Sequence, residues 1–340
     1  MYFKTIIQGR LEFGTQKSYD KVTKMFLQRQ ETYYKTDMIF KFEDIFHEED
    51  LSLEIPRYVG QITEKAFRAT VGLLEYCSQF AVAGSIRAWM INEGEIMHFV
   101  TLEPESDKGV VQSFVKGRKL VKVKGKEEEA IDALSKAIEK YDRHAQAYER
   151  RAKVNFRLNN YHDALRDYNK CINTDPTIPT AYYGRAKIHM LREEWEIAIE
   201  NLDESIKKSI ALQTLYWKSR RLKSECHIKL KEWQKAAFDL KLFTNRKFAE
   251  DDPNKYWLRW AYYHYGIVLL ELEDFQEALK AFDKAADLPE VNDGVSEVDI
   301  LTFRGIAKQK TGKSGYVKDI KEAAAKGGKR AKSMLKNIQK

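Results

Sequence analysis

The residues best suited to metal or acid–base chemistry gather in one acidic stretch, residues 42–50, which reads FEDIFHEED. His47 stands there among carboxylates, and imidazole and carboxylate groups bind divalent cations when their spacing sets a coordination geometry. One histidine among consecutive carboxylates sets no such geometry. We therefore predict a solvated loop and no metal site. The alternative hypothesis is that this negative charge meets a basic groove formed by the residues beyond position 110, in the same chain or in a neighbouring copy.

The sequence contains none of the common motifs for phosphate binding, dinucleotide binding or hydrolysis. The patterns GxxxxGK[ST], GxGxxG, HExxH and GxSxG do not occur in it. Cys77, Cys171 and Cys226 form no CxxC pair, which excludes a zinc ribbon and a disulfide framework and favours a reducing compartment. Cys77 stands in a predicted helix among apolar residues and is expected to be buried and inert. We therefore predict a protein that is not an enzyme and needs no cofactor.

The chain of 340 residues has a helix-favouring composition, with 43% hydrophobic residues, 32% charged residues and six prolines. This composition excludes disordered and collagen-like proteins. The net charge of +8 is uneven, because residues 1–110 carry −4, residues 111–307 carry +3 and residues 308–340 carry +9. No run approaches the roughly 18 apolar residues of a membrane span, and no signal peptide opens the chain. We expect a soluble, cytoplasmic protein.

The residues beyond position 110 repeat with a period of 34 to 42. An alanine recurs at this period, as Ala130, Ala164, Ala198, Ala236 and Ala278. An aromatic residue three positions earlier recurs with it, as Tyr161, Trp195, Trp233 and Phe275. A small residue stands twelve positions before the alanine, as Ala152, Ala186, Ser224 and Gly266. Apolar residues four and eight positions after the alanine place a stripe on one helix, so each unit is predicted to be a pair of helices.

This pattern resembles the tetratricopeptide repeat (TPR), a 34-residue unit of two antiparallel helices. Residues 147–176 and 181–206 match the motif best. The resemblance implies an all-α superhelical solenoid of about five to six helix pairs over residues 111–328. A basic capping helix or tail, residues 329–340, is expected to follow.

Several units depart from the motif. The unit at residues 111–144 has Arg118 in place of the small residue and Gly117 just before it, so its first helix is expected to be irregular, as in a capping half-repeat. The units around Ala236 and Ala278 follow linkers that are four and eight residues longer than the regular period. We expect longer helices or loops to absorb these extra residues.

The resemblance also implies a partner-binding surface, because the first helix of each TPR pair faces the concave side. The residues expected there are Lys119, Lys122, Lys153, Phe156, Arg157, Tyr183, Lys187, Lys218, Arg221, Trp260 and Tyr263. A basic surface with aromatic residues suits an acidic protein or peptide segment. The alternative is that the lysines and arginines only solvate helix faces. The carboxylate clamp of chaperone-binding TPR proteins is absent, since Glu149, Lys153 and Gly184 occupy its places.

Residues 1–110 show no repeat and are predicted to form a small α+β domain. The segments with strand-like composition are residues 2–13, 37–46, 51–59, 85–92 and 95–104. Two helices are expected between them, at residues 18–34 and 63–84, the second with Thr63 as its N-cap and Gly84 at its end. Residues 92–94 form a plausible hairpin turn. The whole chain is therefore predicted to be an α+β domain followed by helical repeats.

Two functions compete on this sequence. The first is a non-enzymatic adaptor or assembly scaffold, whose repeat groove binds a protein partner, either alone or within a larger assembly. The alternative is a nucleic-acid- or ribosome-associated factor that uses the cations of the C-terminal segment, namely Lys326, Lys329, Arg330, Lys332, Lys336 and Lys340. No aromatic residue follows Tyr316, so stacking on bases is not indicated. A third explanation of this segment is a solvated cap without a ligand.

Overall fold

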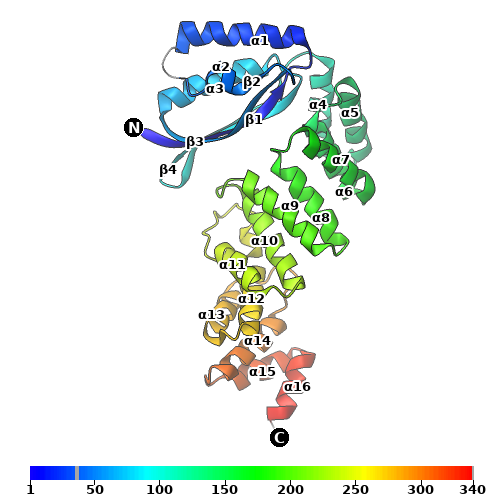
Figure 1. The fold of residues 1–340 in the computed structure, drawn as a ribbon. Coiled ribbons are helices and arrows are strands. Elements are labelled where there is room, and N and C mark those ends of the chain that lie inside the picture. The colour runs from blue at the N-terminus through cyan, green and yellow to red at the C-terminus, as the bar shows by residue number, and fades with distance from the viewer. Residues whose placement is uncertain (35–37, 339–340) are drawn as a thin grey trace. The chain divides into compact units, whose positions relative to one another are not determined.

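The computed structural model describes residues 1–34 and 38–338, and these group into two compact units, Met1–Ile188 and His189–Lys340. The first unit contains an antiparallel β-sheet followed by paired helices, and the second contains paired helices (Figure 1). The predicted fold class, an α+β region followed by an all-α repeat region, is confirmed.

The sheet has five strands in the order β2-β3-β1-β4-β5, and every neighbouring pair is antiparallel. The strands are β1 (Tyr2–Glu12), β2 (Phe46–His47), β3 (Ser52–Thr63), β4 (Ala83–Asn92) and β5 (Glu95–Leu102). The predicted hairpin turn joins β4 to β5, with Glu93 at φ 48° and Gly94 at φ 86°. Two successive residues of positive φ make the tight turn that matches the twist of a two-residue hairpin.

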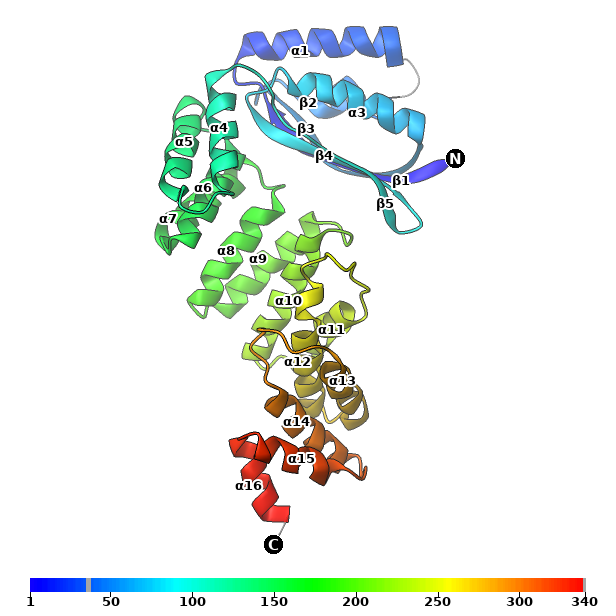
Figure 2. The same ribbon diagram turned by 180° about the vertical axis from the view of Figure 1, so that it is seen from behind.

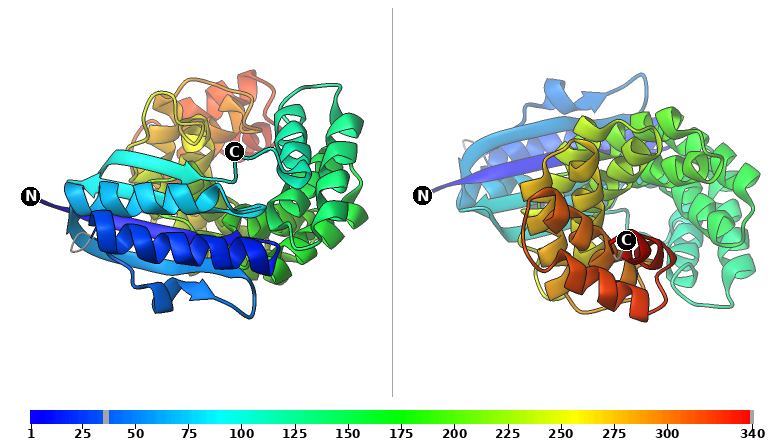
Figure 3. Two further views of the ribbon diagram at one scale, coloured as in Figure 1. Left: turned by 90° about the horizontal axis from the view of Figure 1, so that it is seen from above. Right: turned by 90° about the horizontal axis from the view of Figure 1, so that it is seen from below.

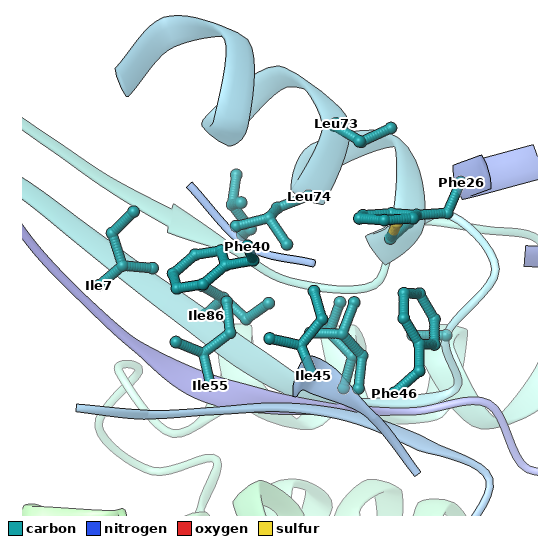
Figure 4. Close-up of a cluster of buried hydrophobic side chains, with 14 of the residues drawn as sticks. Ile7, Phe26, Phe40, Ile45, Phe46, Ile55, Leu73, Leu74 and Ile86 are labelled. Atoms are coloured by element: carbon teal, nitrogen blue, oxygen red, sulfur yellow. The ribbon is translucent and has the colours of Figure 1, made fainter. Parts of the chain in front are cut away.

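Helices α1 (Gln16–Arg29) and α3 (Glu64–Ser78) lie side by side on one face of the sheet (Figure 3). Their starts follow the sequence, because the hydroxyls of Thr15 and Thr63 accept hydrogen bonds from the amides of Ser18 and Ala66, each at 3.2 Å. Between helices and sheet lies the core shown in Figure 4, whose labelled side chains include Ile7, Phe26, Phe46, Ile55, Leu74 and Ile86.

The structure corrects three boundaries in this region. Of the predicted strand at residues 37–46, whose first residue lies outside the described part, residues 38–41 belong to no helix or strand, Phe42–Ile45 form helix α2, and only Phe46 joins a strand. Phe42, Ile45 and Phe46 are spaced so that one turn of helix turns all three toward the core. The helix predicted to reach Gly84 ends at Ser78, because the chain must return to pair with β1.

The third correction concerns the helix predicted at residues 18–34. The α-helix ends at Arg29, and residues Gln30–Tyr34 form a turn of π-helix. The acidic stretch at residues 42–50 is not a loop throughout, since it includes α2 and β2. Its charged side chains are nevertheless exposed to solvent, as predicted.

Helix pairs follow the sheet (Figure 2). In the first unit they are α4 (Gly109–Leu120) with α5 (Glu127–Lys140) and α6 (Ala145–Arg157) with α7 (Tyr161–Thr174). Helix α8 (Pro179–Leu191) spans the boundary between the units, and α9 (Trp195–Lys208) follows it. The later pairs are α10 (Thr214–Lys229) with α11 (Trp233–Thr244), α12 (Leu258–Glu271) with α13 (Phe275–Asp287), and α14 (Glu297–Lys310) with α15 (Tyr316–Ala325). Helix α16 (Lys329–Ile338) closes the described chain.

Small residues allow the two helices of a pair to approach. The five repeated alanines are fully buried. A Cβ atom added to Gly266 would lie 2.7 Å from the ring of Phe282, and one added to Gly117 would lie 2.6 Å from the side chain of Leu134. Gly117, and not Arg118, therefore fills the small position of the first pair. Helix α4 is continuous, so the expectation of an irregular helix is wrong.

A left-handed residue ends the first helix of most pairs, and it is not glycine. Asn159, Glu193, Lys231 and Glu273 have φ between 58° and 62°, each two residues before the second helix begins. In each case the next amide donates to a carbonyl five residues back, as Asn160 does to Asn155 at 2.9 Å. This is the Schellman motif that terminates helices, and it fixes the turn within the pair.

Candidate partner-binding surfaces

In the first unit, three of the predicted groove cations are exposed on helices. Lys119 lies near the end of α4, and Lys153 and Arg157 lie one turn apart on α6. Lys122 is exposed too, but it follows the end of α4 and stands in the loop to α5. Lys153 and Arg157 thus present two cations on one helix face.

The structure brings two further predicted residues together across α6 and α8. The ammonium of Lys187 lies 4.0 Å from the centre of the Phe156 ring, the geometry of a cation–π contact. The Phe156 ring also meets Tyr161 edge-on, with ring centres 5.4 Å apart. Phe156, Tyr183 and Lys187 are each partly buried, so they offer edges and not whole side chains to a ligand.

In the second unit, two of the predicted residues, Lys218 and Tyr263, are partly buried, and the other two are buried. The guanidinium of Arg221 is 4.0 Å from the centre of the Trp257 ring and 5.3 Å from that of Trp260, and both Arg221 and Trp260 are under 10% exposed. These side chains pack α10 against α12 and the 3-10 turn Lys255–Trp257. Lys218 on α10 and Tyr263 on α12 are the two that keep partial contact with solvent.

Burial perturbs the titratable groups around this aromatic cluster. The ring of His264 lies 4.2 Å from that of Trp260, centre to centre. Burial, with smaller contributions from the cations Arg221 and Lys229, lowers the pKa of His264 to about 4. Burial raises the pKa of Tyr263 to about 12. His264 is therefore neutral at pH 7, and the cluster has the character of a packed core.

Sequence reasoning missed a buried ion pair that recurs between the two helices of a pair. Arg151 donates two hydrogen bonds to the buried carboxylate of Asp167, at 2.8 and 2.9 Å, and Arg304 binds Asp319 with the same two distances. Burial alone would raise the pKa of Asp319, but hydrogen bonds from Arg304 and Lys308 lower it. The signal was available, because the basic residue directly precedes the small residue of the first helix.

The first repeats also carry a contact surface for the sheet. The hydroxyl of Tyr141, just after α5, donates to the buried carboxylate of Glu12 on β1 at 2.9 Å. Asp50, from the acidic stretch, lies 3.2 Å from Arg143 and 3.2 Å from Arg10. Neither arginine belongs to the predicted groove residues, so the hypothesis that the acidic stretch meets the basic groove stays a prediction.

A second contact involves the inner helix of the best-matching repeat. The side chain of Gln146 on α6 accepts a hydrogen bond from the amide of Gly84 at 3.1 Å. Arg87 on β4 reaches the carbonyl of Thr177 at 3.5 Å, and burial lowers the pKa of this arginine, partly offset by Asp175. Strand β4 thus contacts the start of α6 and the loop that follows α7.

Groups suited to metal binding are not assembled in the described part of the chain. Among residues 1–34 and 38–338, no three His, Cys, Asp or Glu side chains converge as metal ligands would. Cys77, Cys171 and Cys226 are buried, as predicted for Cys77, and burial raises the pKa of each thiol. Within the same residues, no helix is long and apolar enough to cross a bilayer.

Paired helices with a small residue in the first, an alanine and an aromatic in the second, and a fixed turn between them define a helical-repeat protein. Family models of the tetratricopeptide repeat match residues 124–177 and residues 261–292. The chain therefore contains tetratricopeptide repeats, and the predicted resemblance is confirmed.

A solved structure agrees on the fold. The chain is similar to YrrB, described as a TPR protein with an unusual peptide-binding site, with a TM-score of 0.51 and 19% identity over 61% of this chain and 99% of that one. It is also similar to PilF of Pseudomonas aeruginosa, with a TM-score of 0.49 and 15% identity over 68% of this chain and 98% of that one. At these identities the likeness concerns the fold alone. No curated protein sequence matches the chain.

Proposed function

We propose that this protein is a non-enzymatic interaction adaptor whose TPR surface binds an acidic segment of a partner protein. The observation that carries the proposal is the exposed cation pair Lys153 and Arg157 on the first helix of the best-matching repeat. Exposed arginine and lysine give charge-assisted hydrogen bonds to carboxylates, and arginine can bind one with two parallel bonds. The partly buried ring of Phe156 beside them supplies apolar contact with little loss of side-chain entropy.

The neighbours of this pair support a role in binding. Like charges one helical turn apart repel each other and destabilise a helix. The carboxylates that could offset them are already engaged, because Glu149 is buried and lies 3.3 Å from Arg150, and Asp167 binds Arg151. An acidic ligand would relieve this repulsion, which is a physical reason for it to settle on this face.

The test compares two matched double variants. Lys153→Glu with Arg157→Glu reverses the proposed site, and Arg166→Glu with Lys170→Glu reverses two exposed cations at the same spacing on α7, the second helix of the same repeat. The probe is a fluorescein-labelled peptide of alternating Glu and Leu, with a Gln–Leu peptide as the uncharged control. We expect anisotropy to show binding of the acidic peptide to the wild type and the α7 variant only. Equal binding by both variants, or equal binding of both peptides, would reject the proposal.

A second function is favoured by one feature of α16. Its apolar side packs on α15 through buried Ala331 and partly buried Leu335, which is how a capping helix protects the last repeat. Its opposite side exposes Lys329, Lys332 and Lys336 in one row. We infer that this row can contact a phosphate backbone, and a shift assay with single-stranded RNA at 50 mM and 200 mM salt tests it. Replacing the three lysines by Gln should remove salt-sensitive binding, and RNA binding that survives in the variant would reject this role.

A further inference from the structure

Strand β5 is an edge of the sheet, with only β4 beside it (Figure 2). Alternate N–H and C=O groups of an edge strand point away from the sheet, where they can pair with another extended chain. Six of the eight residues of β5 are exposed, including Ile96 at 40% and Phe99 at 53%. No Asp, Glu, Lys or Arg stands between Glu95 and the end of the strand. Natural sheets usually protect such edges with charges, prolines, bulges or very short strands, and β5 has of these a single bulge, at Met97 between Ile96 and His98.

The opposite edge of the same sheet has these protections. Strand β2 covers the start of β3 but is only two residues long. Beyond that pairing, β3 contains Pro56, which has no N–H to donate, followed by Arg57. The contrast makes β5 the edge that is open to strand addition.

A hollow of about 310 Å³ adjoins β5 near its C-terminal end. Strand residues Val100 and Leu102 line it together with Ser78, the last residue of α3. Two exposed carboxylates, Glu75 and Glu105, stand at this hollow, whereas the third, Glu103, is paired with Arg118. The C-terminal end of a helix carries partial negative charge from its free carbonyls. The hollow is therefore suited to a cationic side chain.

The other face of β5 offers apolar contact. The ring of Phe99 stacks on that of Trp89 of β4, with ring centres 5.3 Å apart and an angle of 15° between the planes. Ile96 is paired with Ile91 and lies on the same face. Because side chains of a strand alternate between faces, a segment paired with β5 would direct one set of side chains to this apolar face and the other set toward the acidic hollow.

We propose that the β5 edge binds an extended partner segment in which apolar and basic residues alternate, so that the partner adds a sixth strand to the sheet. Backbone hydrogen bonds supply the attraction, and the two faces of β5 set the sequence preference. This site is separate from the TPR surface proposed above and prefers the opposite charge. It does not depend on that proposal.

The charges argue against a second copy of this chain as the occupant. Two β5 edges related by a two-fold axis would pair antiparallel, which brings the start of one strand beside the end of the other. Glu95 of one copy would then approach the hollow with Glu75 and Glu105 of the other. Like charges at that position disfavour self-pairing.

The experiment uses the full chain and a fluorescein-labelled peptide of alternating Lys and Val, read by anisotropy. Two methylated forms of this peptide test strand addition, one with the backbone nitrogens methylated along one edge of the extended peptide and the other with those along the opposite edge methylated. An alternating Glu–Val peptide tests the charge preference. We expect binding of the Lys–Val peptide, loss of binding for one of the two methylated forms, and no binding of the Glu–Val peptide. Equal binding of both methylated forms would overturn strand addition, because their charge is unchanged.

Protein variants locate the site. Glu75→Lys with Glu105→Lys should weaken binding of the Lys–Val peptide about tenfold, since two weak surface attractions become repulsions. Glu43→Lys with Glu49→Lys, two exposed carboxylates elsewhere in the same unit, is the matched control and should bind as the wild type does. Equal affinity in the two variants would overturn the site. A dimer by light scattering that the Lys–Val peptide dissociates would overturn the choice of occupant. The Lys153→Glu, Arg157→Glu variant should keep this binding. Failure of the β5 proposal can therefore be distinguished from failure of the proposed TPR surface.

Discussion

Arg143, in the loop between α5 and α6, lies 3.2 Å from Asp50, which precedes β3 of the sheet. The contact belongs to a network that continues through Arg10, 3.2 Å from Asp50, to the carboxylate of Glu12, 2.7 Å from Arg10. Glu12 is 3% exposed. Within the first unit, the sheet and the first repeats are thus joined by charged groups that pair with one another, with Arg10 and Glu12 buried and with Asp50 and Arg143 partly open to water.

Tyr141→Phe tests this network with the smallest possible change. The substitution removes the hydroxyl that donates to Glu12 and leaves the ring in place. A hydrogen bond to a buried charged group contributes roughly 1.5–3 kcal/mol, so we expect a lower free energy of unfolding by about that amount. Thermal unfolding followed by intrinsic fluorescence would measure it. Tyr2→Phe, at a tyrosine that is 68% exposed, is the control and should unfold as the wild type does. An unchanged midpoint for Tyr141→Phe would show that the network adds nothing to stability.

The sequence predicted the repeat core well because a single contact recurs along the chain. Ala164 and Gly266 mark the points where two helices cross, and this requirement for a small residue is visible as a period. The same information predicts helix pairs without reference to any distant part of the chain. Most strand segments of the first unit were visible from composition, since β-branched and aromatic residues are common in strands.

The exposure of the candidate surface was less predictable, because it depends on residues that are distant in sequence. Arg221 occupies a position that faces a ligand in the repeat pattern, yet its guanidinium packs on Trp257, which comes from the longer linker before α12. Gln146 likewise meets Gly84 of the sheet. A period within the repeats carries no information about such neighbours. Whether Lys153 and Arg157 bind a partner stays a prediction.

Gly266→Ala tests the close approach of α12 and α13. The added methyl would lie 2.7 Å from the ring of Phe282, so one of the two helices or the ring must shift. Overpacking of this kind costs about 1–3 kcal/mol, and we expect a correspondingly lower unfolding midpoint in urea. The double variant Gly266→Ala with Phe282→Leu tests whether crowding against the ring is the cause of the destabilisation. If crowding is the cause, the second substitution destabilises the alanine variant less than it destabilises the wild type, and additive effects would contradict this explanation.

Glycine at the turn within each pair should stabilise the protein. Lys231 adopts φ 58°, a left-handed conformation that costs a residue with a side chain roughly 1–2 kcal/mol. Lys231→Gly removes this strain, and the gain is reduced by the greater flexibility of glycine in the unfolded chain. We expect a higher thermal midpoint for Lys231→Gly and a smaller rise for Asn159→Gly, since asparagine tolerates this conformation better. A fall for both variants would mean that the side chains themselves hold the turns.

The stability of the first unit should decrease in mild acid because of His144. This residue precedes α6, is 1% exposed, and its ring centre lies 4.5 Å from that of Phe114. Burial lowers the pKa of His144 to about 3, well below the value near 6.5 of an exposed histidine. The unfolded chain therefore takes up a proton as the pH falls below about 6.5, whereas the folded chain does not until about pH 3, so acid favours unfolding between these values. One pH unit below 6.5, the loss amounts to roughly 1.4 kcal/mol.

His144→Phe removes the titrating group, and we expect its unfolding free energy to fall less than that of the wild type between pH 7 and pH 5. His162→Phe, at an exposed histidine, is the control. Parallel pH profiles for the wild type and His144→Phe would contradict the assignment, because the two proteins differ only at the histidine that is expected to take up the proton.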